Sequence, residues 1–337
     1  MLPALAVADA LRERGVHVTL AGSRERAEAH LVPAAGYELD TFAISGFPRR
    51  PGLGLLRALV RAVRAPFACR RILARRRPHV VLGAGGYVGG PMVLAARTLG
   101  IPAALTEADA HLGLANRLAA PFARRVFLAF PVEGRDWRKD RVVGRPVPVR
   151  PPVAREAART RFGLPALGPV LLVFGGSQGA QALNDVAVDA FGSAGPAVLH
   201  LAGERYVDAL RPRVRRDDYR LVGYTDDFGA ALAAADLALA RAGGTVWELA
   251  AAGVPAVLVP SPNVTADHQT KNARHFERTG GAVVVGEPEL GRVPELIRSL
   301  LDDPDRLAGM AEAMRAVARP DAADTIAEEL IGLARTA

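Results

Sequence analysis

Short apolar runs rich in Val, Leu and Ala alternate along the chain with longer segments of helical Ala/Leu/Arg spacing. Buried parallel strands are continuous apolar runs, and strands that alternate with helices form βαβ units. The pattern therefore predicts an α/β protein built on parallel sheets. The expected strands are 16–22, 79–83, 101–106 and 125–130 in the first half, and 169–176, 196–203, 219–224, 236–241, 254–260 and 281–286 in the second.

A proline-rich segment, 144–154, separates the two halves. It holds four prolines in eleven residues, and proline continues neither a helix nor a central strand, so we expect a semi-rigid linker. A chain of 337 residues is also long enough for two domains. We predict a domain over 1–146, a second over 147–319, and a C-terminal helix over 320–337 that is free to return to the first domain.

Several features of the first half exclude classes of protein. Acidic and basic residues within the first fifteen positions argue against a secretory signal. The longest uncharged run of this half, 78–96, contains five glycines and two prolines, so it does not predict a membrane span. The single cysteine, Cys69, excludes a disulfide framework and a cysteine-based metal site.

Positive charge is concentrated in one stretch. Residues 41–106 hold eleven arginines and no acidic residue, whereas the whole chain has a formal net charge of +8. Between 57 and 77 these arginines are interleaved with Leu, Val, Ile and Phe, which is the pattern of a basic amphipathic helix. With few aromatic residues to stack on bases, this pattern favours an anionic membrane surface over nucleic acid. A solvated helix face is the alternative.

Three predicted strands run directly into glycines and then into a helix, at 83–91, 175–180 and 241–248. Glycine lets backbone N–H groups approach a ligand, and the start of a helix favours negative charge. A diphosphate is the natural ligand. None of the three is a P-loop or a dinucleotide-binding fingerprint, which disfavours a nucleotide-dependent oxidoreductase.

These loops belong to a series of strings that together resemble the MurG family. The strings are LGAGGYVGGP (82–91), GLANRLA (113–119), FPVEG (130–134), VVGRP (142–146), VFGGSQGAQALN (173–184), ARAGGTVWELAAAGVPAVLVP (240–260) and DHQTKNA (267–273). They occur in the family's order over nearly the whole chain.

The resemblance implies a GT-B fold, with two doubly wound Rossmann-like domains facing each other across a cleft. It implies an inverting hexosyltransferase that moves GlcNAc from UDP-GlcNAc to the 4-hydroxyl of undecaprenyl-diphosphate-MurNAc-pentapeptide, converting lipid I to lipid II. That reaction serves peptidoglycan synthesis, and so cell-wall biogenesis, cell shape and division. The family works as a peripheral protein at the cytoplasmic face of the membrane, with no metal and no cofactor. Another lipid-directed UDP-sugar transferase of the same fold, or a non-catalytic UDP-sugar-binding relative, is the alternative.

The resemblance also assigns roles to residues, motif by motif. On the acceptor side these are Gly85, Gly86, Tyr87 and Asn116. For the UDP-sugar they are Gly175, Gly176, Ser177, Gln178, Thr225, Gly243, Gly244, Thr245, Glu248 and Gln269. The only DxD-like pair, Asp303 and Asp305, lies between two helical patterns, where helix capping is expected rather than metal binding.

The chain departs from the family at four motifs. The family's GGTGGH loop, whose histidine is a candidate general base, has no counterpart before Pro3. An internal methionine taken as the start explains this, and a degenerate member that turns over poorly is the other account. The family's HEQN reads Thr106-Glu107-Ala108-Asp109, so Glu107 or Asp109 is the candidate base if burial raises its pKa.

The other two departures lie toward the second domain. GNPVR becomes Gly144-Arg145-Pro146-Val147-Pro148, which leaves Arg145, or Arg150, to replace the family's arginine contact. The stretch RAGGTVWE is one residue shorter than usual and places Trp247 beside Glu248.

Overall fold

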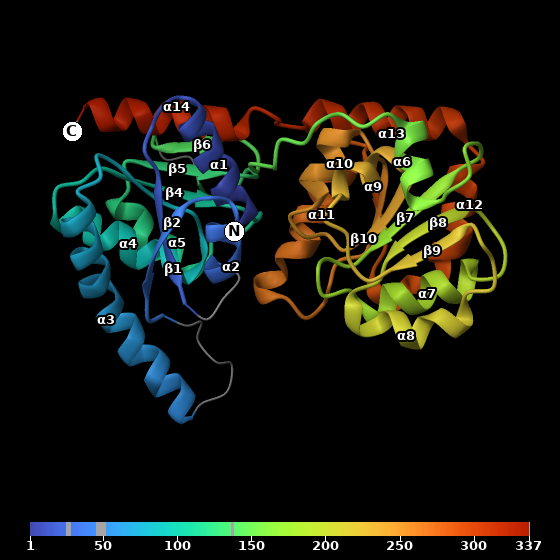
Figure 1. Cartoon of the computed structure of the whole chain (residues 1–337), viewed down its shortest axis with the longest axis horizontal. Coiled ribbons are helices and arrows are strands. Elements are labelled where there is room, and N and C mark those ends of the chain that lie inside the picture. Colours follow the sequence, from blue (N-terminus) through green and yellow to red (C-terminus); the bar gives the residue numbers. More distant parts are fainter. Residues whose placement is uncertain (25–27, 45–51, 136–137, 337) are drawn as a thin grey trace. The chain divides into compact units, whose positions relative to one another are not determined.

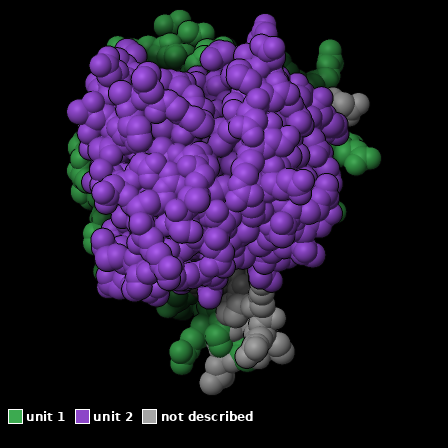
Figure 2. Space-filling model, turned by 90° about the vertical axis from the view of Figure 1, so that its right-hand side faces the viewer, with its two compact units in different colours: residues 1–149, 319–337 green, residues 150–318 purple. Residues whose placement is uncertain are grey.

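The computed structural model describes residues 1–24, 28–44, 52–135 and 138–336. The chain forms two compact units: unit 1 comprises Met1–Val149 and Arg319–Ala337, and unit 2 comprises Arg150–Ala318 (Figure 1, Figure 2). The predicted division after residue 146 lies three positions before the one observed. The C-terminal helix groups with unit 1.

Unit 1 contains two parallel sheets. Strands β1 and β2 form one pair, and the second sheet has the order β3-β4-β5-β6. The strands are β1 Thr19–Ser23, β2 Glu38–Phe42, β3 Val81–Gly83, β4 Ala103–Glu107, β5 Arg125–Leu128 and β6 Asp140–Val142. The helices are α1 Leu2–Glu13, α2 Glu28–Ala34, α3 Leu53–Arg76, α4 Gly86–Thr98, α5 Leu114–Ala119, the 3-10 helix η1 Ala120–Phe122, and α14 Ala322–Arg335.

Helices cover both faces of the four-stranded sheet. Successive residues of β4 point to opposite faces: Leu105 packs with α3 and α4, whereas Ala104 packs with α1 and α14. This alternation is the period of a strand. Ile326 and Leu330 of α14 are fully buried in the second cluster, so the C-terminal helix completes the core of unit 1.

Unit 2 is built on one six-stranded parallel sheet of order β12-β11-β10-β7-β8-β9. Its strands are β7 Val170–Phe174, β8 Ala197–Leu201, β9 Tyr219–Val222, β10 Leu237–Ala240, β11 Ala256–Leu258 and β12 Ala282–Val284. Its α-helices are α6 Arg155–Phe162, α7 Gln181–Phe191, α8 Val207–Leu210, α9 Phe228–Ala234, α10 Val246–Ala252, α11 His268–Arg278, α12 Val293–Leu301 and α13 Pro304–Val317. Its 3-10 helices are η2 Glu204–Tyr206, η3 Arg211–Arg213, η4 Thr265–Asp267 and η5 Glu287–Arg292.

The direction of winding in unit 2 reverses between β7 and β10. From β7 the chain proceeds outward through β8 and β9, and from β10 it proceeds the other way through β11 and β12. In open α/β sheets the crevice at the carboxyl ends of such a strand pair is the usual ligand site. Both glycine loops of unit 2 follow these two strands.

The prediction of an α/β fold with parallel sheets is confirmed, and all ten expected strands are present. Two strands were missed, β2 and β6. Both are short and largely polar, and β6 lies at an edge of its sheet with Arg141 and Val142 exposed. Such strands lack the apolar run on which the prediction depended. Within the described residues no helix is long and apolar enough to cross a membrane.

Candidate functional site

The first glycine loop of unit 2, Gly175–Ala180, connects β7 to the eleven-residue helix α7. In the described part of the chain, the backbone N–H groups of Gly176, Ser177 and Gln178 donate to no acceptor, and all three residues are exposed. Gly179 has a φ of 69°, and a Cβ there would lie 1.9 Å from the carbonyl oxygen of Ala202. Only glycine can come this close to the Ala202 carbonyl, and the loop therefore places exposed backbone N–H donors in front of α7.

The second loop connects β10 to α10 and carries Gly243, Gly244 and Thr245. Their N–H groups likewise donate to no acceptor among the described residues, while their carbonyls close the first turn of α10. Arg241, just before the loop, donates to the carbonyl oxygens of Val259 and Pro260. It is thereby fixed to the end of β11, so this arginine supports the loop rather than extending from it.

Glu248 lies in the first turn of α10, with only 11% of its side chain exposed. Arg150 Nη2 donates to Glu248 Oε1 at 2.9 Å. Of the two arginines named as substitutes for the motif arginine, whose position is taken by Pro148, Arg150 is the one that pairs with Glu248. Arg145 belongs to unit 1, where burial, followed by the charge of Arg145, lowers the pKa of the Met1 amino group.

The loop after β9 carries Thr225 and returns toward β7. Thr225 Oγ1 accepts from the N–H of Asp227, and Asp227 in turn caps α9 by accepting from Ala230 N. The ring of Phe228 meets that of Phe174, the last residue of β7, edge to face at 5.2 Å. This contact brings the loop of an edge strand back to the centre of the sheet.

Gln269, in the first turn of α11, is the last of the residues predicted to bind the UDP-sugar. Its Oε1 accepts from the N–H of Ser261 at 2.8 Å, which leaves the amide NH₂ as the group it can offer a ligand. Asn272, three residues on, is fully buried and donates to the carbonyl oxygen of Ala242 at 3.3 Å. The helix is thus attached to the second glycine loop.

A buried polar network lies beneath the first glycine loop, and the sequence analysis missed it. His200 is fully buried between two partners, with Nδ1 2.8 Å from Tyr219 Oη and Nε2 3.0 Å from Asn184 Oδ1. Asn184 Nδ2 donates to the carbonyl oxygen of Ala202, the atom that Gly179 approaches. The signal in the sequence was a histidine inside the apolar run 196–203.

The predicted residues of unit 1 gather at the carboxyl ends of β3 and β4. Gly85 and Gly86, at the start of α4, have φ values of 84° and 64°, and a Cβ on Gly85 would lie 3.5 Å from the carbonyl oxygen of Thr106. Asn116 is 2% exposed and donates both to that carbonyl and to Glu107 Oε2, each at 2.9 Å. Tyr87 is half-buried and packs against the core of α3 and α4.

Glu107 is 8% exposed, and both of its carboxylate oxygens accept hydrogen bonds. Oε1 accepts from the N–H groups of Ala108 and Asp109, and Oε2 accepts from Gly113 N and Asn116 Nδ2. The carboxylate therefore holds the loop 108–113 in place. Of the two candidate bases, Asp109 is the half-buried one carried on that loop.

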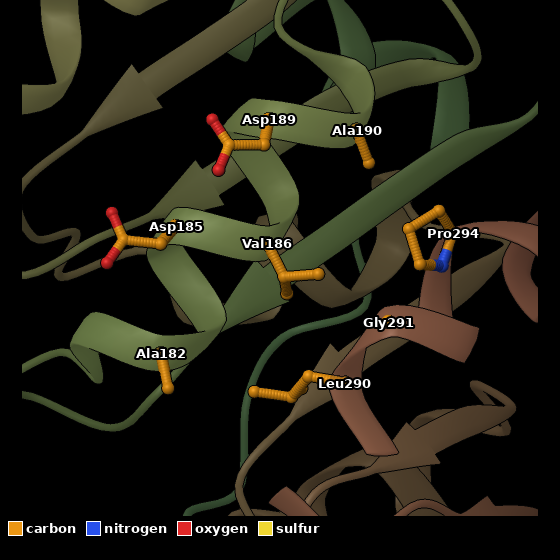
Figure 3. A pocket seen from close by; sticks show the side chains of 8 residues that line it. All are labelled: Ala182, Asp185, Val186, Asp189, Ala190, Leu290, Gly291 and Pro294. Atoms are coloured by element: carbon orange, nitrogen blue, oxygen red, sulfur yellow. The ribbon is translucent and has the colours of Figure 1, made fainter. Parts of the chain in front are cut away.

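Two other features lie apart from these loops. A groove of about 470 Å³ between α7 and η5–α12 is lined by none of the predicted residues; Figure 3 shows Val186 facing Leu290 across it, with the carboxylates of Asp185 and Asp189 turned away. The described residues contain no group of three or more His, Cys, Asp or Glu side chains arranged to hold a metal ion. Asp303 caps α13 by accepting from Arg306 N, as expected.

Known proteins resemble the chain over nearly its whole length. Residues 1–128 match the glycosyltransferase family 28 N-terminal domain, and residues 170–326 match the glycosyltransferase family 28 C-terminal domain. A relative from Acidithiobacillus ferrooxidans is 45% identical over 98% of this chain and 94% of its own length, and one from Salinibacter ruber is 42% identical over 98% and 93%. Both are named UDP-N-acetylglucosamine--N-acetylmuramyl-(pentapeptide) pyrophosphoryl-undecaprenol N-acetylglucosamine transferase.

Solved structures agree. The crystal structure of Acinetobacter baumannii MurG has a TM-score of 0.78 and 28% identity, over 98% of this chain and 95% of that one. The calicheamicin glycosyltransferase CalG4, at 18% identity and a TM-score of 0.68, shares the fold alone. The expected GT-B fold and the resemblance stated from the motifs are both confirmed, and the chain belongs to the MurG branch of glycosyltransferase family 28.

Proposed function

We propose that this protein transfers GlcNAc from UDP-GlcNAc to the 4-hydroxyl of lipid I, with inversion at the anomeric carbon, in peptidoglycan synthesis. The observation that carries the proposal is the donor site of unit 2. Two loops follow the adjacent strands β7 and β10, and in each of them three backbone N–H groups donate to no acceptor in the part of the chain that the structure describes. A partly buried carboxylate, that of Glu248, lies one turn beyond the second loop.

The donor loops suit the chemistry of a UDP leaving group. As the glycosidic bond breaks, negative charge accumulates on the diphosphate, and N–H groups fixed before the reaction stabilise it at no cost of reorganisation. The hydroxyls of Ser177 and Thr245 add two donors, and the positive end of α7 adds to the favourable potential. We assign Glu248 to the ribose hydroxyls, the segment around Thr225 to uracil, and the amide NH₂ of Gln269 to the sugar.

The acceptor is assigned to unit 1. The start of α4, at Gly85 and Gly86, offers N–H groups for the acceptor diphosphate, and α4 is thirteen residues long. Asn116 lies beside it, and its buried Oδ1 accepts no hydrogen bond from the described residues. Because the oxygens of Glu107 are occupied by backbone N–H groups, we assign the general base to Asp109 and the placement of its loop to Glu107.

Helix α3 is proposed to bind the cytoplasmic face of the membrane. Its inner face is buried through Ala65, Cys69 and Leu73, yet a second apolar stripe is exposed on the opposite side. That stripe consists of Leu56, Val60, Val63 and Phe67, which are 60%, 47%, 68% and 68% exposed. Exposed arginines flank it, namely Arg57, Arg64, Arg70 and Arg71. Apolar side chains bordered by cations fit anionic lipid, and α3 extends from the sheets of its unit (Figure 1).

The test is transfer of labelled GlcNAc from UDP-GlcNAc to a lipid I analogue, with UDP-GalNAc as the competing donor. We expect a lipid II product, loss of turnover with Glu248→Ala and with Asp109→Asn, and full turnover with Arg155→Ala. Arg155 forms an exposed ion pair with Asp236 in the same unit, and no hydrogen bond or ion pair joins it to a proposed residue within the described part of the chain. A chain that binds UDP-GlcNAc tightly and yet transfers nothing to this acceptor would contradict the proposal.

A further inference from the structure

Arg150 packs against two neighbouring residues at the start of α9, Phe228 and Gly229. Its guanidinium lies over the ring of Phe228, 5.8 Å from the ring centroid. Its stem fills the space in front of Gly229, where an added Cβ would lie 3.0 Å from Arg150 Cδ. Only 29% of the side chain is exposed. A guanidinium fixed by an aromatic face and a close packing contact loses little further freedom when it forms a hydrogen bond.

This fixed guanidinium engages one oxygen of Glu248. The Nη2–Oε1 distance is 2.9 Å, and no donor among the described residues reaches Oε2. A glutamate carboxylate on an exposed helix turn rotates freely about its terminal bond. Here the ion pair selects one orientation and leaves one oxygen available to a ligand.

We propose that Arg150 is a positioning residue for nucleotide recognition: by holding Oε1 of Glu248, it directs Oε2 toward the hydroxyls of the ribose. This inference rests on the proposed function, in which Glu248 receives those hydroxyls. A preoriented acceptor binds a hydroxyl more tightly because no side-chain entropy remains to be lost on binding. Arg150 acts through Glu248 and makes no contact of its own with the ligand.

The proposal differs measurably from a direct contact between Arg150 and the diphosphate. A phosphate contact strengthens every ligand that carries the diphosphate, whether or not its ribose has hydroxyls. A positioning role strengthens only ligands with ribose hydroxyls. Comparing UDP with 2′,3′-dideoxy-UDP therefore separates the two.

The experiment is isothermal titration calorimetry of both ligands against the full chain and four variants: Arg150→Ala, Arg150→Lys, Glu248→Ala and Arg155→Ala. The wild type is expected to prefer UDP by about tenfold or more, as befits a hydrogen bond to a charged group. Arg150→Ala and Glu248→Ala should both bring the ratio close to one while the affinity for dideoxy-UDP stays the same. Arg150→Lys should restore part of the ratio, and Arg155→Ala, the matched control, should keep it. Thermal melting of each variant verifies folding.

Two results overturn the inference alone: an Arg150→Ala variant that keeps the wild-type ratio, or one that loses affinity for both ligands equally. The second would place Arg150 on the diphosphate. A wild type that does not bind UDP, or a Glu248→Ala variant that keeps the ratio, would instead overturn the donor-site assignment itself. Because those failures appear without any change at Arg150, they are distinguishable from failure of the inference.

Discussion

Acidification should destabilise unit 2 through His200. The ring is fully buried, and burial lowers its pKa to about 3 from an ordinary value of 6.5. Asn184 Nδ2 already donates to Ala202, so Asn184 Oδ1 is an acceptor and His200 Nε2 must carry the proton. Nδ1 then accepts from the Tyr219 hydroxyl. The neutral ring satisfies all of its partners, and a second proton would place an uncompensated charge in the core.

The sign and size follow from linkage. The unfolded chain binds a proton below pH 6.5, whereas the folded unit does not until about pH 3. Stability is therefore complete above pH 6.5 and is lost as the pH falls toward 3. At pH 5 the loss is about 2 kcal/mol, because the unfolded histidine is then almost wholly protonated. The size of this loss depends on the pKa of the histidine in the unfolded chain. It hardly depends on the pKa in the folded unit, provided that this pKa lies well below 5.

The assay is urea unfolding at pH 8 and pH 5, followed by the fluorescence of Trp247. Trp247 is 4% exposed and belongs to unit 2. The other tryptophan of the chain, Trp137, lies outside the described residues and is replaced by phenylalanine, so that the signal comes from one unit. In this background His200→Gln, which does not titrate, should lose about 2 kcal/mol less than its parent between the two pH values.

A control is His17→Gln, which removes an exposed histidine of unit 1, outside the unit that Trp247 reports on. It should leave the pH dependence of the parent unchanged. If His200→Gln and its parent lost the same free energy of unfolding between pH 8 and pH 5, the argument that the buried ring stays neutral would be refuted.

Three further changes test other parts of the structure. Gly179→Ala should abolish calorimetrically detected UDP binding and lower the free energy of unfolding of unit 2 in urea by about 2 kcal/mol or more. The reason is that the new Cβ would lie 1.9 Å from the carbonyl oxygen of Ala202. Unchanged UDP affinity would contradict this. Arg159→Leu should destabilise unit 2 by about 3 kcal/mol in the same assay, because Arg159 is 3% exposed and pairs with Asp236 at 2.7 Å. A loss below about 1 kcal/mol would show that this ion pair contributes little to the stability of the unit. Phe67→Asp should lower the affinity for phosphatidylglycerol vesicles, measured by co-sedimentation, about tenfold or more, because the ring is 68% exposed. Binding of UDP should not change. Equal vesicle binding would contradict the proposal that α3 binds the membrane.

How far the sequence could predict the fold depended on burial. Strands β7, β8 and β10 are buried at every position, so each is an unbroken apolar run in the sequence. Among the described residues, strand β2 pairs only with β1. It is built from Glu-Leu-Asp-Thr-Phe, and the carboxylate of Asp40 accepts from Arg75 and Arg76 of α3. Asp40 is explained by two arginines near the end of α3, which lie 35 and 36 residues further along the chain, and no local pattern reveals such partners.

The residues of the candidate site likewise fall into those that local sequence could predict and those that it could not. Glycine loops after strands are local features, so the positions of Ser177, Thr245 and their neighbours could be predicted from the strings alone. The partner of Glu248 could not, because Arg150 lies 98 residues away in a proline-rich segment that has no periodicity. The motif names Arg145 or Arg150 as the substitute, and the contacts of Arg150 with Phe228, Gly229 and Glu248 are visible only in the folded structure.

Glu107 shows why a motif position is not yet a chemical role. In the sequence, a glutamate that survives where a neighbouring histidine has become Thr106 is a natural candidate for the missing base. In the structure its two oxygens receive four N–H donors from residues 108, 109, 113 and 116, so its carboxylate is already committed to organising the loop. A base must accept a proton from the acceptor hydroxyl, and a carboxylate whose lone pairs are filled accepts one only by giving up those contacts. The same four bonds that disfavour Glu107 as the base fix the loop that carries Asp109, the proposed base.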